Sequence, residues 1–441
     1  MKNIYFIGIG GIGMSAIARY YNAKGFKVSG YDKTPSPLTE ALENEGIEVH
    51  YEDNTDYVPK DVAETLVVYT PAIPKDMGEL VYVQEKGYRV IKRSRMLGEI
   101  SQGQRCMAVA GTHGKTTTST LVSHIFTASG EGCSAFLGGI SKNYNTNLLI
   151  SSNDVVVAEA DEFDRSFLQL FPEIAVITSM DADHLDIYGD EAHIREAFKA
   201  FASQVSGTVI KKYGLDITPE DTKAKIMTYS FGNASADFYS EALENGHFNL
   251  HYPGGVIEDC VVGIPGWVNV ENATAAAAIG LTYGLNPSKI KGALASFSGV
   301  KRRFDIQVKR PDCVYIDDYA HHPEEISAAL SSIRKSYPDM KMTVVFQPHL
   351  YTRTRDFAPE FAEALSKADK LILLDIYPAR EEPIPGVTSE IIFKDVTCQE
   401  KVLLLRSELM DYLKNEKVEM LVTLGAGDID RFVGQIADML G

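Results

Sequence analysis

Short runs of apolar residues alternate along this chain with longer segments in which apolar and polar positions are mixed. The apolar runs occupy residues 3–9, 27–31, 66–69, 106–110, 154–158, 174–178, 313–316, 343–346, 370–374 and 420–424. A continuous apolar run of this length is typical of a strand buried on both faces of a parallel sheet. Intervening segments such as 14–24 and 359–367 predict helices. The pattern therefore predicts an α/β fold built on parallel sheets.

The length of the chain predicts several domains. Its 441 residues are about three times a typical domain of roughly 150 residues. A polar stretch at residues 101–104 precedes a new strand, and a basic turn at 298–303 follows an alanine-rich segment. These breaks predict domains at residues 1–103, 104–299 and 300–441.

The overall charge of the chain argues against some kinds of binding partner. The 43 basic and 60 acidic side chains give a formal net charge of −17. Such a chain lacks the basic face of a nucleic-acid-binding protein, although backbone N–H groups can still bind a small anion. No apolar run approaches the ~18 residues of a membrane helix, and the five cysteines are scattered without a CxxC pair. We therefore expect a reduced, cytoplasmic protein with neither a nucleic-acid nor a membrane partner.

A glycine-rich turn follows the first predicted strand. Gly8, Gly10 and Gly13 fit the pattern G-x-G-x-x-G, and Asp32 ends the next strand about twenty residues later. Such glycines allow a tight turn that brings a helix N-terminus to a diphosphate. Because the turn binds phosphate rather than nicotinamide, NAD and other nucleotide diphosphates are equally compatible, and a turn without a ligand is the third alternative. Thr70 follows a later strand and is expected at the same edge of the sheet.

A second glycine loop, residues 111–118, joins a predicted strand to a predicted helix at residues 119–128. Its order Gly-Thr-His-Gly-Lys-Thr-Thr-Thr is typical of a phosphate loop, although Val109 occupies the usual place of the first glycine. Lys115 is expected to reach the β- and γ-phosphates of a nucleotide, and the Thr116 hydroxyl to bind Mg²⁺. The sequence thus predicts an ATP site in the central part of the chain.

Acidic side chains follow two neighbouring strands of the same predicted sheet. Glu159 is the first polar residue after the run 154–158, and Asp183 and His184 follow the run 174–178. A magnesium ion that shares a substrate phosphate needs one or two carboxylates, which favours Glu159 and, on charge alone, Asp183 over His184. Helix capping or simple solvation is the alternative role for each acid.

Polar clusters also mark the later part of the chain. Asn269 precedes an alanine-rich helix at residues 274–280 and either contacts a base or caps the helix. Arg302 and Arg303 either clamp a phosphate at the second domain boundary or form a solvated turn. In the third domain, polar, aromatic or glycine clusters follow four strands, at residues 317–324, 347–355, 375–381 and 425–428. Strand ends of one parallel sheet converge, so these clusters predict a binding site, whereas the adjacent His321 and His322 make a poor metal site.

Taken together, these motifs resemble the Mur ligases in identity and order. The resemblance rests on the opening Ile9–Ser15 turn, the 111–117 loop, the Glu159 cluster, Asp183-His184, Asn269 with Asn272, Arg302-Arg303-Phe304, and the segments 317–323 and 347–353. It covers almost the whole chain. It implies an N-terminal Rossmann-like domain for a UDP sugar, a central P-loop ATPase-type domain with a parallel sheet, and a C-terminal Rossmann-like α/β domain for an amino acid.

The resemblance also implies roles for individual residues. The UDP-sugar contacts would be Gly10, Gly11, Ile12, Gly13, Met14, Ser15, Asp32, Thr70 and Asn147. The ATP contacts would be Gly111, Thr112, His113, Gly114, Lys115, Thr116, Thr117, Asn269, Arg303 and Asp317. Magnesium would be held by Thr116, Glu159 and His184, which overrides the preference for Asp183, and Lys115 and His184 would be the catalytic residues. His322, His349 and Arg353 would lie on the amino-acid side.

The implied activity is ATP-dependent amide formation between L-alanine and the carboxylate of UDP-N-acetylmuramate, through an acyl phosphate, in peptidoglycan precursor synthesis. The chain departs from the family pattern at Val268 and Leu350, where a histidine and an arginine are common, and Lys199 is expected to be a surface helix residue. A ligase for another amino acid or peptide, an NAD-dependent oxidoreductase and a nucleotide-regulated binding module are the alternatives. We expect a monomer or a homodimer.

Overall fold

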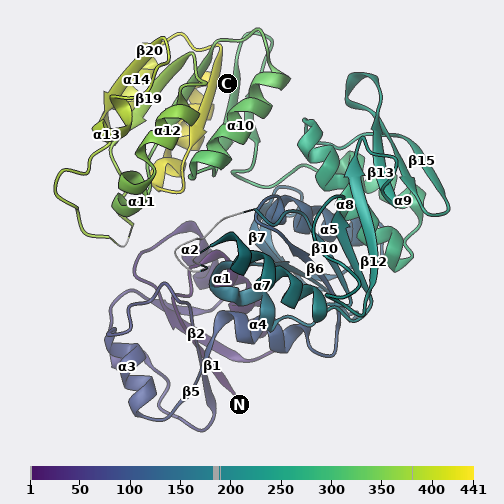
Figure 1. Ribbon diagram of the computed structural model, residues 1–441. Coiled ribbons are helices and arrows are strands. Elements are labelled where there is room, and N and C mark those ends of the chain that lie inside the picture. The colour runs from purple at the N-terminus through teal and green to yellow at the C-terminus, as the bar shows by residue number, and fades with distance from the viewer. Residues whose placement is uncertain (1, 182–187, 189, 380) are drawn as a thin grey trace. The chain divides into compact units, whose positions relative to one another are not determined.

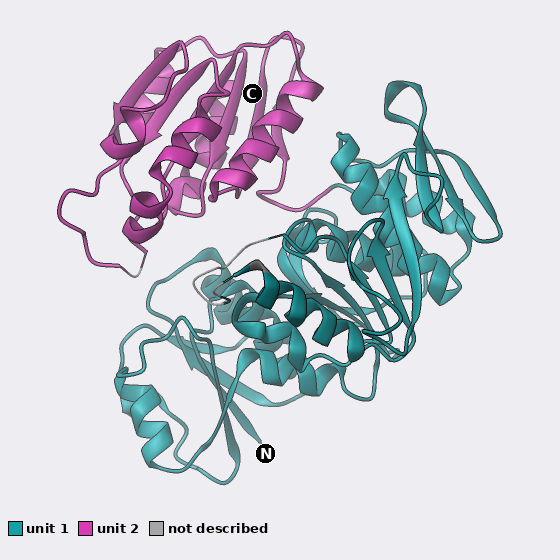
Figure 2. Cartoon of the chain, in the orientation of Figure 1, with its two compact units in different colours: residues 1–298 teal, residues 299–441 magenta. Residues whose placement is uncertain are grey.

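The computed structural model describes residues 2–181, 188, 190–379 and 381–441 of the chain. It forms two compact units, residues 1–298 and 299–441 (Figure 2). The first unit contains two sheets and the second contains one, and helices pack on the faces of all three (Figure 1). Three largely parallel sheets covered by helices confirm the predicted α/β fold class. None of the described helices combines the length and the apolar character that a membrane crossing requires.

The N-terminal sheet is five-stranded and wholly parallel, in the order β3-β2-β1-β4-β5. Its strands are β1 (Asn3–Ile7), β2 (Lys27–Tyr31), β3 (Glu48–His50), β4 (Thr65–Tyr69) and β5 (Arg89–Lys92). Its helices are α1 (Ile12–Ala23), α2 (Pro37–Asn44), α3 (Gly78–Glu85) and α4 (Arg93–Ser101). The start of α2 shows why the helices begin where they do: the Ser36 hydroxyl accepts a hydrogen bond from the Thr39 N–H, and Pro37 occupies the first helical position.

The central sheet has ten strands in the order β15-β14-β13-β12-β11-β10-β6-β9-β7-β8. The strands are β6 (Arg105–Ala110), β7 (Ser134–Ser141), β8 (Thr146–Leu149), β9 (Val155–Ala160), β10 (Ile174–Ile177), β11 (Thr208–Lys212), β12 (Lys225–Phe231), β13 (Phe238–Ala242), β14 (Phe248–Tyr252) and β15 (Gly255–Cys260). Pairing is parallel from β13 through to β7, as predicted, but β14, β15 and β8 join antiparallel at the two ends. Hairpins can extend a buried parallel sheet at its edges because an antiparallel strand tolerates one solvated face.

The helices of this part are α5 (Lys115–Ala128), α7 (Glu191–Ser203), α8 (Trp267–Tyr283) and α9 (Pro287–Ser296), with a short 3₁₀ segment η2 (Phe163–Gln169). A continuous apolar core joins the two sheets of the first unit, and the Tyr20 ring of α1 packs edge-on against Phe136 of β7 at 5.2 Å between centroids. The N-terminal and central sheets are therefore held together by packed side chains as well as by the polypeptide link.

The second unit has a six-stranded sheet in the order β16-β17-β21-β18-β19-β20, of which only β16 pairs antiparallel. Its strands are β16 (Asp305–Lys309), β17 (Val314–Asp318), β18 (Met342–Phe346), β19 (Lys370–Leu374), β20 (Glu400–Leu404) and β21 (Met420–Leu424). Its helices are α10 (Pro323–Ser336), α11 (Tyr351–Asp356), α12 (Ala358–Leu365), α13 (Glu390–Phe393), α14 (Leu409–Lys414) and α15 (Val433–Leu440). Neighbouring residues of β18 enter separate apolar clusters, Val344 on one face and Val345 on the other. This explains why its strands are continuous apolar runs.

Several predicted boundaries were wrong, and each has a local cause. The first strand ends at Ile7 rather than at residue 9, because Gly8 turns the chain with a φ of +88°. The helix after the second loop begins at Lys115 rather than at 119. Glu159 lies inside β9 and not after it. The alanine-rich helix begins at Trp267 rather than at 274, so Asn269 is in its first turn.

Candidate functional site

The second glycine loop is built by a strand, a tight turn and a helix start at the carboxyl edge of the central sheet. β6 ends at Ala110, and α5 begins at Lys115 after Gly114, which has a φ of +80°. Gly111 has a φ of +134°, and a Cβ there would lie 2.0 Å from the Thr178 hydroxyl. Only glycine fits so close an approach. The turn leaves the N–H groups at the start of α5 directed outward, which is the arrangement that binds a phosphate.

Lys115 lies in a buried electrostatic network at this loop. Its ammonium donates a hydrogen bond to the Gly111 carbonyl at 2.7 Å and pairs with the Glu162 carboxylate at 2.8 Å. The side chain is only 14% exposed. Burial opposes its charge, but the attraction of Glu162, Asp161 and Glu159 prevails and raises the pKa of Lys115 above its ordinary value. The loop therefore carries a fixed, permanently charged ammonium.

Glu159 and Thr116 place two oxygen donors side by side. Glu159 pairs in register with Val109 of the neighbouring β6, so its carboxylate projects beside the loop. Its Oε1 accepts a hydrogen bond from the Thr116 hydroxyl at 3.1 Å, and its Oε2 accepts one from the Gly138 N–H at 3.2 Å. Hard oxygen donors next to a phosphate loop suit Mg²⁺. The third predicted ligand, His184, and its rival Asp183 lie outside the described residues.

The other predicted ATP contacts around this loop are tied to the strand end after β10. The Thr112 and Ser179 hydroxyls share a hydrogen bond of 2.8 Å, and the His113 N–H donates to the Ser179 hydroxyl at 2.9 Å. Thr117 follows Thr116 in the first turn of α5. In α8, the Asn269 amide donates to the Pro265 carbonyl at 2.6 Å, so it holds the chain entering the helix. Three residues further on, Asn272 Oδ1 would lie 2.9 Å from a Cβ at Gly114, which places α8 against the loop.

The first glycine loop has a different local chemistry. The N–H groups of Gly8 and Ile9 donate to the Tyr31 carbonyl at 2.8 and 2.9 Å. The Asp32 carboxylate accepts a hydrogen bond from the Gly10 N–H at 2.8 Å. Gly11 caps α1 without help from a side chain, which leaves the N–H groups of the first turn for a ligand. The helix start at Ile12–Ser15 and Thr70, which follows β4, lie at the same edge of the N-terminal sheet.

Asn147 lies between the two sheets of the first unit and is fully buried. Its amide donates to the Ile12 carbonyl at 2.7 Å and to the Ser15 hydroxyl at 2.9 Å, and its Oδ1 accepts from Arg19 at 3.0 Å. These bonds fasten β8 to the helix of the first glycine loop. A substrate contact of Asn147 stays a prediction.

Arg93 is a candidate that the sequence reasoning missed. It is the first residue of α4, directly after the end of β5, and its Nη1 would lie 3.1 Å from a Cβ at Gly13. Its Nη2 is 3.6 Å from the Asp161 carboxylate, which follows β9. One guanidinium thus lies between the first loop and the acidic cluster of the second. The basic segment 92–95 at the carboxyl edge of the sheet was the signal that could have identified it.

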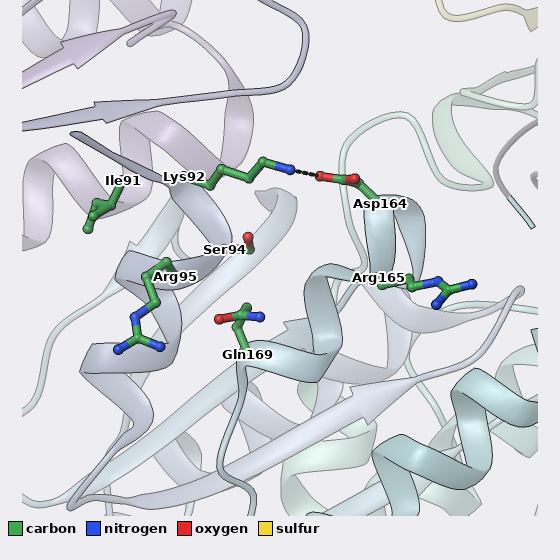
Figure 3. A pocket seen from close by; sticks show the side chains of 7 residues that line it. All are labelled: Ile91, Lys92, Ser94, Arg95, Asp164, Arg165 and Gln169. Atoms are coloured by element: carbon green, nitrogen blue, oxygen red, sulfur yellow. Dashed lines mark hydrogen bonds and ion pairs between the residues drawn. The ribbon is translucent and has the colours of Figure 1, made fainter. Parts of the chain in front are cut away.

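A cavity of about 230 Å³ lies near this junction but outside both loops. Figure 3 shows its lining, which comes from β5, α4 and η2: Ile91, Lys92, Ser94, Arg95, Asp164, Arg165 and Gln169. The Lys92 ammonium pairs with Asp164 at 2.7 Å across it. None of these seven residues was a predicted site residue. The cavity is an ion-paired crevice between α4 and η2, and Lys92 and Asp164 neutralise each other there.

In the second unit, Asp317 is buried and fully engaged with protein groups. Its carboxylate accepts hydrogen bonds from Arg302 Nε at 3.1 Å and from the Thr423 hydroxyl at 2.6 Å. Burial raises the pKa of Asp317 to about 6, although Arg302 and Thr423 oppose the rise. Arg303 lies over the Tyr319 ring at 5.2 Å. The predicted contacts of Asp317 and Arg303 to ATP stay predictions.

The polar strand ends of the second unit do meet at one edge, as predicted from parallel topology. His321, after β17, contacts the His349 ring after β18 at 6.1 Å between centroids, and His349 stacks on Tyr377, after β19, at 5.9 Å. Gln347 joins the fourth strand end by a 3.0 Å hydrogen bond to Asp428. The histidine pair lies in the turn between β17 and α10, with His322 at the N-cap of that helix and Arg353 on α11.

The half-buried His321 ring lies beside a carboxylate in this cluster, and burial lowers the pKa of His321. Its Nδ1 lies 3.2 Å from the Glu325 carboxylate. Burial opposes ionisation of Glu325, but His321 and the backbone N–H groups of residues 321 and 322 prevail and lower the pKa of Glu325 to about 2. The carboxylate therefore stays charged and fixes the turn that carries His321 and His322.

Comparisons with known proteins agree with this geometry. Three family models match consecutive parts of the chain: the Mur ligase family, catalytic domain, at residues 3–105; the Mur ligase middle domain at 109–280; and the Mur ligase, glutamate ligase domain, at 302–427. The UDP-N-acetylmuramate–L-alanine ligase of Porphyromonas gingivalis is 50% identical over 98% of each chain. The ligase of that name from Flavobacterium psychrophilum is also 50% identical, over 99% of this chain and 97% of its own.

Solved structures show the same relationship. The crystal structure of the UDP-N-acetylmuramate-alanine ligase from Thermotoga maritima superposes with a TM-score of 0.83 at 26% identity, over 99% of this chain and 98% of the other. A murein peptide ligase from Psychrobacter arcticus shares the fold with a TM-score of 0.74 at 22% identity, over 100% and 99% of the two chains. With three domain matches in order and relatives at half identity along the whole length, the chain belongs to the Mur ligase family.

Proposed function

We propose that this chain is an ATP-dependent ligase that joins L-alanine to the carboxylate of UDP-N-acetylmuramate in peptidoglycan precursor synthesis. The observation that carries the proposal is the second loop, where a buried lysine and a carboxylate–hydroxyl pair flank a helix start. Relatives at 50% identity with that activity in their names support the choice of substrates. The NAD-dependent alternative leaves this loop without a use, so the ligase is preferred.

ATP is proposed to bind at the second loop. The N–H groups of Gly114 and the start of α5 hold the phosphates, and Lys115 neutralises the charge that develops on the γ-phosphoryl group during transfer. Lys115 needs only to exchange its Glu162 partner for phosphate oxygens, because its ammonium already lies at the loop. Such transfer depends mainly on positioning and electrostatics, which is what this loop supplies.

The residues present fit a magnesium ion. Glu159 and Thr116 offer a carboxylate and a hydroxyl 3.1 Å apart, and the described residues contain no cluster of three or more His, Cys, Asp or Glu side chains that would hold a metal by itself. That is the donor set of a magnesium ion that takes its remaining ligands from substrate phosphates and water. When bound, the ion would add positive charge beside the transferring phosphoryl group. His184 is proposed as its third protein ligand.

The UDP sugar binds at the first loop, with its diphosphate at the start of α1. Arg93 supports this placement because its guanidinium lies beside Gly13 and also faces Asp161 of the ATP-side cluster. We assign Arg93 to the diphosphate or the sugar-linked carboxylate, which must pass between the two loops to reach the γ-phosphate. Both nucleotides are anions, so local positive groups must offset a chain charge of −17.

Amide formation is proposed to proceed in two steps. A carboxylate oxygen of the muramate attacks the γ-phosphorus, the bond from that phosphorus to the bridging oxygen breaks, and ADP leaves. The amino group of alanine, after its ammonium has lost a proton, attacks the acyl carbon, and inorganic phosphate leaves from the tetrahedral intermediate. His322, His349 and Arg353 are proposed to hold the amino acid. The two nucleotide substrates favour a cytoplasmic location.

The test is phosphate release from the full-length protein with ATP, Mg²⁺ and UDP-N-acetylmuramate, and with alanine, glycine, serine or a short peptide as the amine. Stimulation by alanine above the other amines is expected. A response only to the peptide would make the chain a murein peptide ligase instead. ATP binding with no amine-stimulated release would contradict a ligase of either kind and favour a nucleotide-regulated binding module.

A further inference from the structure

An aromatic pair with one exposed member lies where α8 begins beside the end of β12. Trp267, the single tryptophan of the chain, is the first residue of the helix and is 40% exposed. Its ring stacks on Phe231 at 5.2 Å between centroids and 26° between planes. Phe231 thus supports one side of the indole, while a large part of the indole stays open to solvent. A rigid, exposed aromatic surface of this kind can bind a flat ligand.

The pair belongs to the same edge of the sheet as the second glycine loop. β6, β10, β11 and β12 are parallel neighbours, and Phe231 is the last residue of β12 just as Ala110 is the last residue of β6. The register places Ala110 level with Thr228, three strands away at ~14 Å, and Phe231 lies three residues, or ~10 Å, further toward the same edge. Figure 1 shows α8 beside β12, and α8 also packs against α5, the helix that the loop begins.

Helix α8 connects the pair directly to the loop. Asn272 Oδ1 would be 2.9 Å from a Cβ at Gly114, and Trp267 begins the same helix five residues earlier. At 1.5 Å per residue, this is ~7.5 Å along the helix axis. One α-phosphate and one ribose separate the β-phosphate of a nucleotide from its base, so a base extending from the loop along α8 would approach the start of this helix.

We propose that Trp267, supported by Phe231, is the platform on which the adenine of ATP stacks. The inference rests on the proposed function only in placing the ATP phosphates at residues 111–117. Stacking needs only the flat face of a base and makes no use of hydrogen bonds at its edge. The platform therefore contributes affinity for purine nucleotides and little discrimination between adenine and guanine.

Because Trp267 is the only tryptophan, the intrinsic fluorescence of the full-length protein reports on this position alone. Titration with ATP or ADP and Mg²⁺ is expected to change the emission. Inorganic triphosphate with Mg²⁺ is expected to displace ATP without changing the emission itself, because it carries no base. Unchanged emission at ATP concentrations that saturate phosphate release would overturn the platform, as would a change caused by UDP-N-acetylmuramate alone.

Kinetics of variants supply a second readout. Trp267→Ala is expected to raise the KM for ATP roughly tenfold, within the range that base stacking contributes, while kcat and the KM for the UDP sugar stay near wild type. Trp267→Phe should recover most of the loss. Phe171→Ala is the matched control, since Phe171 is 45% exposed but precedes β10, at the opposite edge of the sheet.

The two proposals fail in different ways. An unchanged KM for ATP in Trp267→Ala, with wild-type phosphate release intact, overturns the platform and leaves the ligase standing. Wild-type protein that releases no phosphate with any amine contradicts the ligase. A nucleotide-dependent emission change in that same protein would still support stacking at Trp267.

Discussion

The two glycine loops have the same backbone plan and very different chemistry. Each follows a parallel strand and opens a helix, at Gly8–Ser15 and at Gly111–Thr118. The first contains no charged side chain, and the Asp32 carboxylate satisfies its Gly10 N–H. The second carries Lys115 and faces Glu159 and Glu162. A helix start alone is enough to bind a phosphate, whereas transferring one requires charges fixed around it. The comparison therefore assigns binding to the first loop and phosphoryl transfer to the second.

Lys115→Ala should separate the loops most clearly. Loss of the ammonium removes charge stabilisation from the transferring phosphoryl group, so kcat for phosphate release should fall by roughly a hundredfold to a thousandfold. Calorimetric binding of UDP-N-acetylmuramate should stay near wild type, since its loop is elsewhere. Lys199→Ala is the control, because Lys199 of α7 pairs with Asp216 and Asp221, which follow β11, away from the second loop. Equal losses in Lys115→Ala and Lys199→Ala would refute the role of Lys115.

Glu159→Gln should also impair phosphate release at the second loop and spare UDP-sugar binding at the first, because it weakens the binding of Mg²⁺. The amide keeps the shape but loses the charge that attracts Mg²⁺, so kcat at a fixed, low magnesium concentration should fall by about a hundredfold. A higher magnesium concentration should restore part of the lost kcat. Chelation by EDTA should stop phosphate release in the wild type and leave binding of the UDP sugar measurable. Magnesium-independent turnover would contradict this assignment.

The backbone of the two loops can be compared by adding one methyl group. Gly111→Ala puts a Cβ at a φ of +134° and 2.0 Å from the Thr178 hydroxyl, so it should lower the free energy of unfolding by about 2–3 kcal/mol. Gly11 has a φ of −62° and no neighbour closer than 3.6 Å, so Gly11→Ala should change it by less than about 0.5 kcal/mol. Chemical denaturation measures both, and similar destabilisation by the two substitutions would contradict the geometry.

Asp32→Ala should give the smallest effect, confined to the first loop. The Gly10 N–H loses its acceptor and the turn loosens, so the KM for the UDP sugar should rise about tenfold. The KM for ATP should not change. Asp32→Asn keeps an oxygen acceptor, so its KM for the UDP sugar should lie between those of the wild type and Asp32→Ala. A change in the KM for ATP as large as that for the sugar would mean that the loops do not act separately.

The fold class and the family could be predicted because both depend on patterns within short stretches of sequence. Apolar runs and glycine turns indicated parallel α/β domains, and the loop at Lys115 with the motifs around it indicated the family; both predictions are confirmed. The expected ligase activity agrees with the names of the relatives at 50% identity. The side-chain roles of the individual site residues stay predictions.

The rest depends on contacts between distant parts of the chain. Arg93 is recognised as a candidate only from the fold, which brings Gly13 and Asp161 to either side of it. In the same way, only the fold shows that Glu162 pairs with Lys115. The start of α8 was missed because its apolar residues surround the whole helix, so no amphipathic period marks where it begins. That error also hid the pairing of Trp267 with Phe231, which are 36 positions apart in the sequence.

In the proposed reaction, the muramate carboxylate is phosphorylated at the second loop, and the amine of alanine then displaces the phosphate from the acyl carbon. The most direct test uses UDP-N-acetylmuramate with ¹⁸O in its carboxylate and follows the label by mass spectrometry of the released phosphate. One ¹⁸O atom is expected in each phosphate formed during alanine-dependent turnover, because that oxygen attacks the γ-phosphorus and leaves with it. Phosphate without label, released together with the amide product, would contradict the acyl-phosphate route.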